Sequence, residues 1–128
     1  MKKVINTPNA PLPVGPYSQA IRFGNIAFVS GQVSIDPKTN ELVSDTIENE
    51  TTQVLNNVGA ILKEMGASFD DVLKVSVFVK DMGQYAQING VYAQFFTGDT
   101  PPARELVEVA KLPLNVNIEI SVIVGLKS

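Results

Sequence analysis

The sequence predicts an α+β domain of order ββαβαββ, in which two helices cover one face of a mixed sheet. Two β-rich runs joined by a tight-turn dipeptide come first, two amphipathic helical stripes flank a central strand, and two further strands end the chain. With 128 residues, 45% of them apolar and 18% charged, the chain is expected to form a single domain, residues 1–128, around one core.

The first two strands are expected at residues 18–23 and 26–33. Gly24-Asn25 stands between them, and this pair suits the positive φ angles of a tight hairpin. The two strands are therefore predicted to be antiparallel neighbours.

A first helix is predicted to follow, because Asp45-Thr46-Ile47-Glu48 has the form of a capping box with Asp45 as the N-cap and Glu48 at N3. Apolar residues then recur at helical spacing and give one buried stripe. Gly66 supplies a left-handed stop. The stripe consists of Ile47, Val54, Leu55, Val58, Ile61, Leu62 and Met65.

A central strand is predicted at residues 74–80, where valine occupies every second position from Val75. Asp81 and Gln84 then offer the start of a second helix, which is expected to end near Gly98. The apolar stripe of this helix consists of Tyr85, Ile88, Tyr92, Phe95 and Phe96.

Two last strands are predicted at residues 103–110 and 117–125, joined by a turn at 112–115. Leu106 and Ile123 are out of phase with the other apolar residues of these strands, so they are expected to point away from the helices. The residues expected beneath the helices are Val107, Val109, Ile118, Ile120, Val122 and Val124. The open face would also carry Arg104, Glu108, Glu119 and Ser121. Such a mixed face predicts an oligomer with sites between its subunits.

Composition excludes several classes of function. The chain has no Cys and no His, which excludes disulfides, thiol nucleophiles, His-based triads and zinc or iron sites built on these residues. A net charge of −3 and a pI of about 4.8 argue against nucleic acid as a partner. No apolar run approaches the ~18 residues of a membrane span, so the chain is expected to stay in the cytoplasm.

Arg104 is the strongest candidate for ligand binding, because a guanidinium can hold a planar carboxylate through two hydrogen bonds. The only other arginine, Arg22, lies beside the hairpin turn and is interpreted as a surface residue. Glu119 is expected on the same face as Arg104, where burial would raise its pKa and let it take a proton from water. Two alternatives stay open. Arg104 could be a surface arginine paired with a neighbouring glutamate, and Glu119 a solvated or ion-paired strand residue, or the two could form a plain salt bridge with each other.

Three further positions could contact a ligand. Tyr17 follows the rigid turn Gly15-Pro16 and either packs or presents its hydroxyl. Gly31 interrupts an apolar strand, which marks either a bulge or a close approach of the backbone to a ligand. Asn89 lies among the aromatic residues of the second helix and is interpreted as a buried hydrogen-bonding group rather than a ligand contact.

The same segments resemble the Rid family, also called the YjgF or imine deaminase family, along nearly the whole chain. The resemblance rests on several motifs in the family's order. They are Asn9-Ala10-Pro11, Gly15-Pro16-Tyr17-Ser18-Gln19-Ala20, Val29-Ser30-Gly31-Gln32, Val77-Phe78-Val79-Lys80-Asp81-Met82, Asn89-Gly90-Val91-Tyr92, Pro102-Ala103-Arg104, Val107-Glu108-Val109-Ala110-Lys111-Leu112-Pro113 and Ile118-Glu119-Ile120. The segment from Pro102 to Ile120 is the most specific of them.

The resemblance implies a fold similar to chorismate mutase of the bacillus type. It also implies a homotrimer whose sheets face inward, with sites in the clefts between subunits. The implied activity is hydrolysis of 2-imino acids, or of enamine tautomers such as 2-aminoacrylate and 2-aminocrotonate, to 2-keto acids and ammonia. The resemblance implies no metal and no organic cofactor.

The resemblance also implies roles for the candidate residues. Arg104 would clamp the substrate carboxylate, Glu119 would orient the attacking water, and Tyr17 would close over the ligand. Ser30 and Gly31 would contribute hydrogen bonds through the hydroxyl or the backbone.

Asn89 would support the pocket wall. The sequence departs from the family at Leu106, where many members have cysteine, and at Ser121, where many have a second glutamate. Leu106 would change the volume and polarity of the pocket and with them the range of substrates.

Two other functions are possible. One is a sensor that binds 2-keto acids without turnover. The other is a ribonuclease or translation inhibitor, against which the acidic pI and the absence of His argue.

Overall fold

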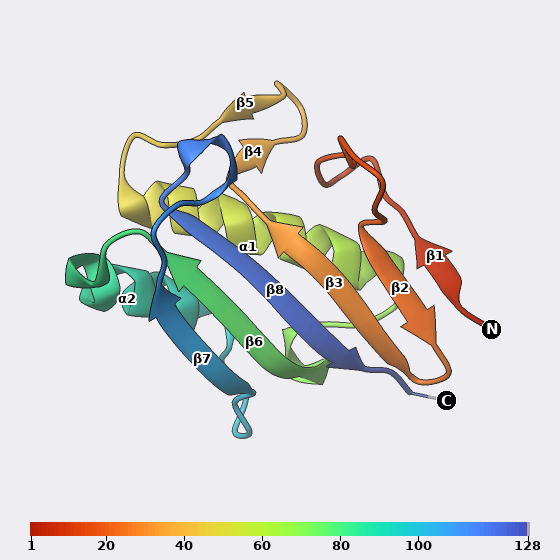
Figure 1. Ribbon diagram of the computed structural model, residues 1–128. Coiled ribbons are helices and arrows are strands. Elements are labelled where there is room, and N and C mark those ends of the chain that lie inside the picture. Colours follow the sequence, from red (N-terminus) through yellow and green to blue (C-terminus); the bar gives the residue numbers. More distant parts are fainter. Residues whose placement is uncertain (128) are drawn as a thin grey trace.

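The computed structural model describes residues 1–127 and shows two layers, a six-stranded sheet with both helices packed on one face (Figure 1). The strands of this sheet follow the order β1-β2-β3-β8-β6-β7, and all neighbours are antiparallel except β6 and β7. The elements are β1 (Lys3–Ile5), β2 (Ala20–Phe23), β3 (Ile26–Gln32), β4 (Ile35–Asp36), β5 (Glu41–Leu42), α1 (Ile47–Glu64), η1 (Phe69–Asp71), β6 (Val72–Val79), η2 (Met82–Gln84), α2 (Tyr85–Phe95), β7 (Ala103–Glu108), η3 (Pro113–Asn115) and β8 (Ile118–Gly125).

The predicted α+β class and the order of its seven elements, ββαβαββ, are confirmed. Two features were not predicted: β1, which adds an edge strand beside β2, and the small separate hairpin of β4 and β5. Both consist of strands only two or three residues long, which are too short to show a periodic pattern.

The core lies between the sheet and the helices. Alternate residues of β6 and β8 point toward the helices, beginning with Val75 and Ile118, and are fully buried. The apolar stripe of α1 packs against them, and Leu55 and Ile61 are fully buried in it. The period-two strands and the helical stripe thus bury one face each, as their patterns predict.

The start of α1 differs from the prediction by one residue. The N-cap is Thr46, whose hydroxyl accepts a hydrogen bond from the Asn49 backbone N–H at 3.0 Å, so Asp45 as N-cap was wrong. The Asp45 carboxylate instead accepts from the Asn49 side chain, and this hydrogen bond lowers the pKa of Asp45. The predicted stop is confirmed, because Gly66 has a φ of 76°.

The start of the second helix is divided between two elements. Asp81 caps the short turn η2, since its carboxylate accepts from the Gly83 backbone N–H. Gln84 precedes α2 without a side-chain cap, and the helix ends at Phe95 rather than near Gly98. The predicted second helix is therefore confirmed, but it is shorter than expected.

The phase of β7 was predicted wrongly. Val75 is buried beneath the helices and pairs with both Arg104 and Val122, so Arg104 lies on the helix side of the sheet. Leu106, two residues on, lies on the same side against the core, while Val107 is exposed on the other. β7 is an edge strand with no fully buried residue, so its apolar residues do not mark its buried face.

The opposite face of the sheet carries no helix (Figure 1). On β8 the predicted phase is confirmed, since Ile123 lies on this open face opposite the buried Val122 and Val124. Large apolar side chains on the open face are exposed to between 42% and 64% of their area. They are Val4, Phe23, Phe28, Leu73 and Val107.

Candidate functional site

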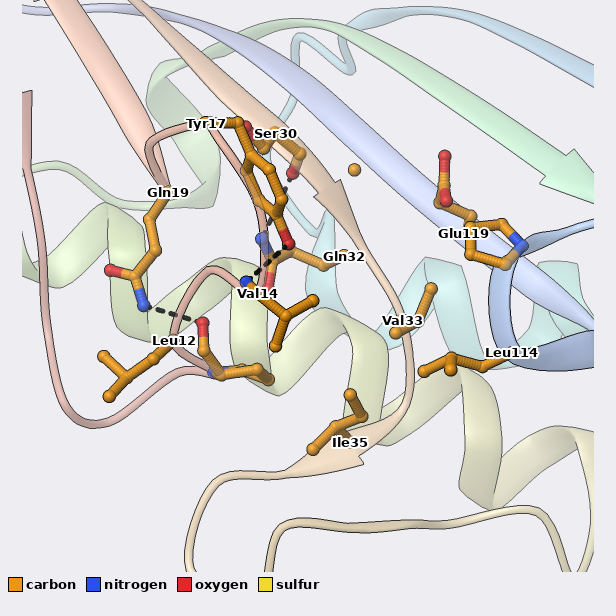
Figure 2. Close-up of a pocket in the computed structure, with 13 residues that line it drawn as sticks. Leu12, Val14, Tyr17, Gln19, Ser30, Gln32, Val33, Ile35, Leu114 and Glu119 are labelled. Atoms are coloured by element: carbon orange, nitrogen blue, oxygen red, sulfur yellow. Dashed lines mark hydrogen bonds between the residues drawn. The ribbon is translucent and has the colours of Figure 1, made fainter.

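A cavity of about 500 Å³ lies beside Glu119 (Figure 2). Three segments form its wall: the loop before β2, the end of β3 with the residues leading into β4, and the turn η3 before β8. Figure 2 shows Tyr17, Val14 and Leu12 on one side of the cavity and Glu119 and Leu114 on the other. This cavity brings several predicted site residues together, since Tyr17, Ser30, Gly31 and Glu119 all line it.

Glu119 extends from β8 on the open face, between the buried Ile118 and Ile120. It is half-buried, and burial raises the pKa of its carboxyl above the ordinary value of 4.5. A carboxylate destabilised in this way binds a proton more strongly than one in water, which suits a general base that takes a proton from a bound water. The predicted direction of this pKa shift is confirmed.

Gly31 lies directly against Glu119. The register between β3 and β8 shifts between Val29 and Gln32, so the strand has a bulge at this position. A Cβ added at Gly31 would lie 2.6 Å from the Glu119 Oε2 atom. The interpretation of Gly31 as part of a bulge is therefore confirmed, and its missing side chain leaves room for the Glu119 carboxylate. A close approach of the backbone to a ligand stays a prediction.

We expect Gly31→Ala to displace the Glu119 side chain and to reduce the activity proposed below about 100-fold, since a misplacement of about 1 Å can have this effect on a reacting group. The φ of Gly31 lies outside the left-handed region, so alanine can adopt it and the fold should persist. Gly90→Ala is the matched control, because nothing lies within 4 Å of a Cβ at that helical position. Wild-type kcat/KM in Gly31→Ala would contradict this assignment.

Tyr17 and Ser30 border the same cavity. The Tyr17 ring is 51% exposed, so it is not a core residue, and its hydroxyl is 3.5 Å from the Val14 backbone N–H. The Ser30 hydroxyl donates to the Ser18 carbonyl at 2.6 Å, which ties β3 to the segment carrying Tyr17. Ser30 thus positions the cavity wall, and its hydroxyl hydrogen is already engaged.

Three buried polar side chains hold the segments of the cavity wall. Gln19 accepts from the Thr7 backbone N–H and donates to the carbonyls of Thr7, Ala10 and Pro11. Glu50 on α1 binds the backbone and side-chain N–H groups of Asn117, before β8. The Asn57 side chain donates to the carbonyls of Val33 and Ile35. Each segment of the cavity wall is therefore held in place by hydrogen bonds to a buried side chain, and this pre-organises the site.

We expect Gln19→Met to lower the free energy of unfolding by about 2–4 kcal/mol, because it leaves several buried backbone groups without partners while keeping the side-chain volume. Urea unfolding measures this change. Gln87→Met, at an exposed position on α2, is the matched control and should leave the stability close to that of the wild type. Equal midpoints for the two variants would show that the Gln19 hydrogen bonds do not stabilise the loop.

A second group of polar side chains surrounds Arg104 on the helix side of β7. The Arg104 Nη1 donates to the Asn89 Oδ1 at 2.7 Å, and Nη2 donates to the Tyr85 hydroxyl at 3.1 Å. The guanidinium carbon also lies 4.8 Å from the centre of the Tyr92 ring. These contacts hold the guanidinium in one orientation and leave other N–H donors for a ligand.

These contacts decide between the interpretations of Arg104 and Asn89. Arg104 has no carboxylate partner among residues 1–127, so pairing with a neighbouring Glu was wrong. Asn89 is a half-buried hydrogen-bonding residue, and the group it binds is Arg104 itself. Leu106 follows Arg104 on the same side of β7.

Two members of this group, Tyr85 and Tyr92, were interpreted from the sequence only as parts of an apolar stripe. With Asn89 they follow the spacing i, i+4, i+7, which puts all three on one face of α2. Burial raises the pKa of Tyr92, against the opposing effect of the Arg104 charge, so the phenol stays neutral. Its hydroxyl is buried without a hydrogen-bond partner within the described part of the chain.

Arg104 and Glu119 do not meet within one chain. Val75 sets Arg104 on the helix side of the sheet, whereas Glu119 alternates with the buried Ile118 and Ile120 and lies on the open face. The prediction of a shared face and the alternative of a salt bridge between the two are therefore wrong for a single chain. The sheet itself separates the cationic group from the cavity.

The described residues also limit other kinds of site. Between residues 1 and 127, no three Asp or Glu side chains are grouped closely enough to hold a metal ion. Neither described helix combines the length and the apolar character needed to cross a membrane. The polar side chains that line the cavity are the Glu119 carboxylate, the Tyr17 phenol, the Ser30 hydroxyl and the amides of Gln19 and Gln32.

The fold and site define a class of protein: a two-layer α+β chain that carries an oriented guanidinium on one side of its sheet and a proton-accepting carboxylate in a cavity on the other. Comparison with known proteins agrees with this description. The profile of the family described as Endoribonuclease L-PSP matches residues 7–126. The chain belongs to this family, which is the Rid or YjgF-like family that its motifs resemble.

Three relatives illustrate the similarity. A RutC family protein of Pyrococcus horikoshii is 54% identical over 123 residues, which are 96% of this chain and 97% of that protein. The 2-iminobutanoate/2-iminopropanoate deaminase of Escherichia coli is 45% identical over 125 residues, covering 96% and 97% of the two chains. The crystal structure of E. coli TdcF with bound serine is 38% identical, with a TM-score of 0.93 over 98% of this chain and 99% of that one.

Proposed function

We propose that this protein hydrolyses 2-imino acids and their enamine tautomers to 2-keto acids and ammonia. The observation that carries the proposal is Glu119, a carboxylate whose pKa burial raises, facing a cavity. Arg104, oriented by Asn89 and Tyr85, supplies the complementary group for a substrate carboxylate. The name of the E. coli relative, a deaminase of this kind at 45% identity, supports the same activity.

The complete site is proposed to lie between two copies of the chain in a homotrimer. One copy would supply Glu119, Tyr17, Ser30 and Gly31, and the next would supply Arg104 with Asn89 and Leu106. Two observations support this arrangement: the two groups lie on opposite sides of one sheet, and the open face exposes large apolar side chains that an oligomer would bury.

The proposed reaction begins with Arg104 binding the substrate carboxylate through two parallel hydrogen bonds. Glu119 orients a water and takes its proton as the water oxygen bonds to the imine carbon. The electron pair of the C=N bond passes to nitrogen, which receives the water proton back from Glu119. Glu119 then takes the proton of the carbinol hydroxyl and passes it to nitrogen as the carbon–nitrogen bond breaks. Ammonia leaves, and the carbinol oxygen becomes the carbonyl of a 2-keto acid. Tyr17 closes over the ligand and limits the entry of further water.

The experiment is to measure ammonia release from 2-iminobutanoate generated in situ, against its spontaneous decay. Acceleration that depends on the protein supports the proposal. The principal alternative is a sensor that binds a 2-keto acid without turnover; such a protein would bind 2-oxobutanoate and leave the imine to decay at its spontaneous rate. That result would contradict the enzymatic proposal.

A ribonuclease activity is the second candidate, because the description of the matching family names an endoribonuclease. The net charge of −3 disfavours binding of a phosphate backbone. RNA cleavage that Arg104→Ala abolishes would favour this candidate. The proposed metabolic activity is expected to take place in the cytoplasm, on a small-molecule substrate and without nucleic acid or a membrane as partner.

A further inference from the structure

The wall of the cavity away from Glu119 is largely aliphatic. The side chains that form it belong to all three wall segments, and Figure 2 shows Val14, Val33, Ile35 and Leu114 around the cavity. They are Leu12, Val14, Val33, Ile35 and Leu114. A substrate bound with its reacting carbon at Glu119 would place its remaining substituent, the amino-acid side chain, against this wall.

We infer that the cavity selects imino acids with long or branched apolar side chains, of the size of the leucine side chain, over those with a methyl or hydroxymethyl group. This inference rests on the proposed imine hydrolysis and names its substrate class. A cavity of about 500 Å³ is large enough for such a substrate, whereas a methyl substituent would leave most of the apolar wall in contact with water.

Exposure of the wall supports the inference. Within a single chain Leu12 is 61% exposed and Leu114 is 62% exposed, so each has apolar surface that a substituent in the cavity can cover. Covering these side chains with an apolar substituent removes that surface from water and favours binding. Gln19 and Ser30, two polar side chains of the wall, already bind backbone atoms and offer less to a polar substituent.

The backbone at Leu114 is an independent observation. Leu114 has a φ of 58° and Asn115 a φ of 55°, so two successive residues other than glycine adopt the left-handed conformation. This conformation is unfavourable for a leucine, and glycine would adopt it without strain. The strain lies in the cavity wall and is explained if the Leu114 side chain is needed there to contact a ligand.

The first test compares kcat/KM for two imines generated in situ by an amino-acid oxidase, one from leucine and one from alanine. We expect the leucine-derived imine to be favoured about 60-fold, because each of its three additional carbons is worth about 4-fold on burial. An equal or lower kcat/KM for the leucine-derived imine overturns the inference and leaves the proposed function standing. Hydrolysis of neither imine overturns both.

The second test uses Leu114→Gly, which removes the side chain and suits the left-handed backbone. We expect the preference for the leucine-derived imine to fall about 10-fold, since most of an apolar contact is lost. Asn40→Gly, at a φ of 62° outside the cavity, controls for the glycine, and Leu42→Ala controls for loss of an exposed leucine. Both controls should keep the preference. An unchanged preference in Leu114→Gly, with the fold verified by circular dichroism, overturns the assignment of the wall.

Discussion

Arg104→Ala is expected to lower kcat/KM for 2-iminobutanoate by roughly 30- to 900-fold, equivalent to about 2–4 kcal/mol of lost charge-assisted hydrogen bonding to the substrate carboxylate. The effect should fall mainly on KM, because the carboxylate is bound both before and during the reaction. Steady-state ammonia release measures it. The fold should tolerate the change, since Arg104 lies on an edge strand and is not fully buried.

Two further variants make this test specific. Arg22→Ala removes the only other arginine, whose side chain donates to the Gly24 carbonyl beside the hairpin turn, and it should keep wild-type kinetics. Arg104→Lys keeps the charge but not the planar pair of donors, so its kcat/KM should lie between those of the wild type and Arg104→Ala. Full activity in Arg104→Ala would remove this residue from the mechanism.

Glu119→Gln is expected to reduce kcat about 10²- to 10⁴-fold, the usual contribution of general acid–base catalysis, with a smaller change in KM. The amide keeps the shape of the side chain and cannot take a proton from water. Glu41→Gln, an exposed carboxylate on β5, is the matched control and should keep its kcat. Unchanged turnover in Glu119→Gln would refute its role as the base.

The pH dependence of the wild type follows from the same residue. Glu119 must be ionised to act as a base, and burial raises its pKa above the ordinary value of 4.5. The activity should therefore fall as the pH decreases through this raised pKa, at a higher pH than for a carboxylate in water. An acid limb centred at or below pH 4.5 would contradict this account of Glu119.

The raised pKa has a consequence for stability. A carboxyl group whose pKa is higher in the folded state binds its proton more strongly there than in the unfolded chain. Proton binding therefore adds to the free energy of unfolding below the unfolded pKa, and this contribution is lost as the pH rises through the folded pKa. Glu119→Gln should for this reason raise Tm at neutral pH, and the gain should vanish toward pH 4.5, the ordinary value for the group. A higher Tm of Glu119→Gln at neutral pH would show that the ionised Glu119 carboxylate destabilises the fold while it serves the reaction.

Much of the fold could be predicted because strong local patterns determine it. The stripe of α1, its stop at Gly66 and the alternation in β6 and β8 each depend on a buried face, and the structure confirms all of them. β7 could not be predicted in the same way. It is an edge strand, and its apolar residues lie on both sides, so only pairing with β6 determines where Arg104 points.

The candidate residues could be chosen from residue type, strand position and the family motifs, but their grouping in space could not be predicted. The cavity contains Glu119, Tyr17, Ser30 and Gly31, as expected of one site. Arg104 belongs to another group with Tyr85, Asn89 and Tyr92. The two tyrosines fit the apolar stripe of α2, so the sequence pattern gives no sign of their contacts with Arg104. Distances across a sheet depend on register, which a pattern along one strand does not contain.

The central claim is that one catalytic site takes its carboxylate from one chain and its guanidinium from another. Unfolding Arg104→Ala and Glu119→Gln together in equal amounts and refolding the mixture tests it, with each variant refolded alone as control. Half of the chains supply Glu119 and half of their neighbours supply Arg104, so the refolded mixture as a whole should regain about a quarter of wild-type activity. A mixture as inactive as its two components, although trimers form, would contradict the claim.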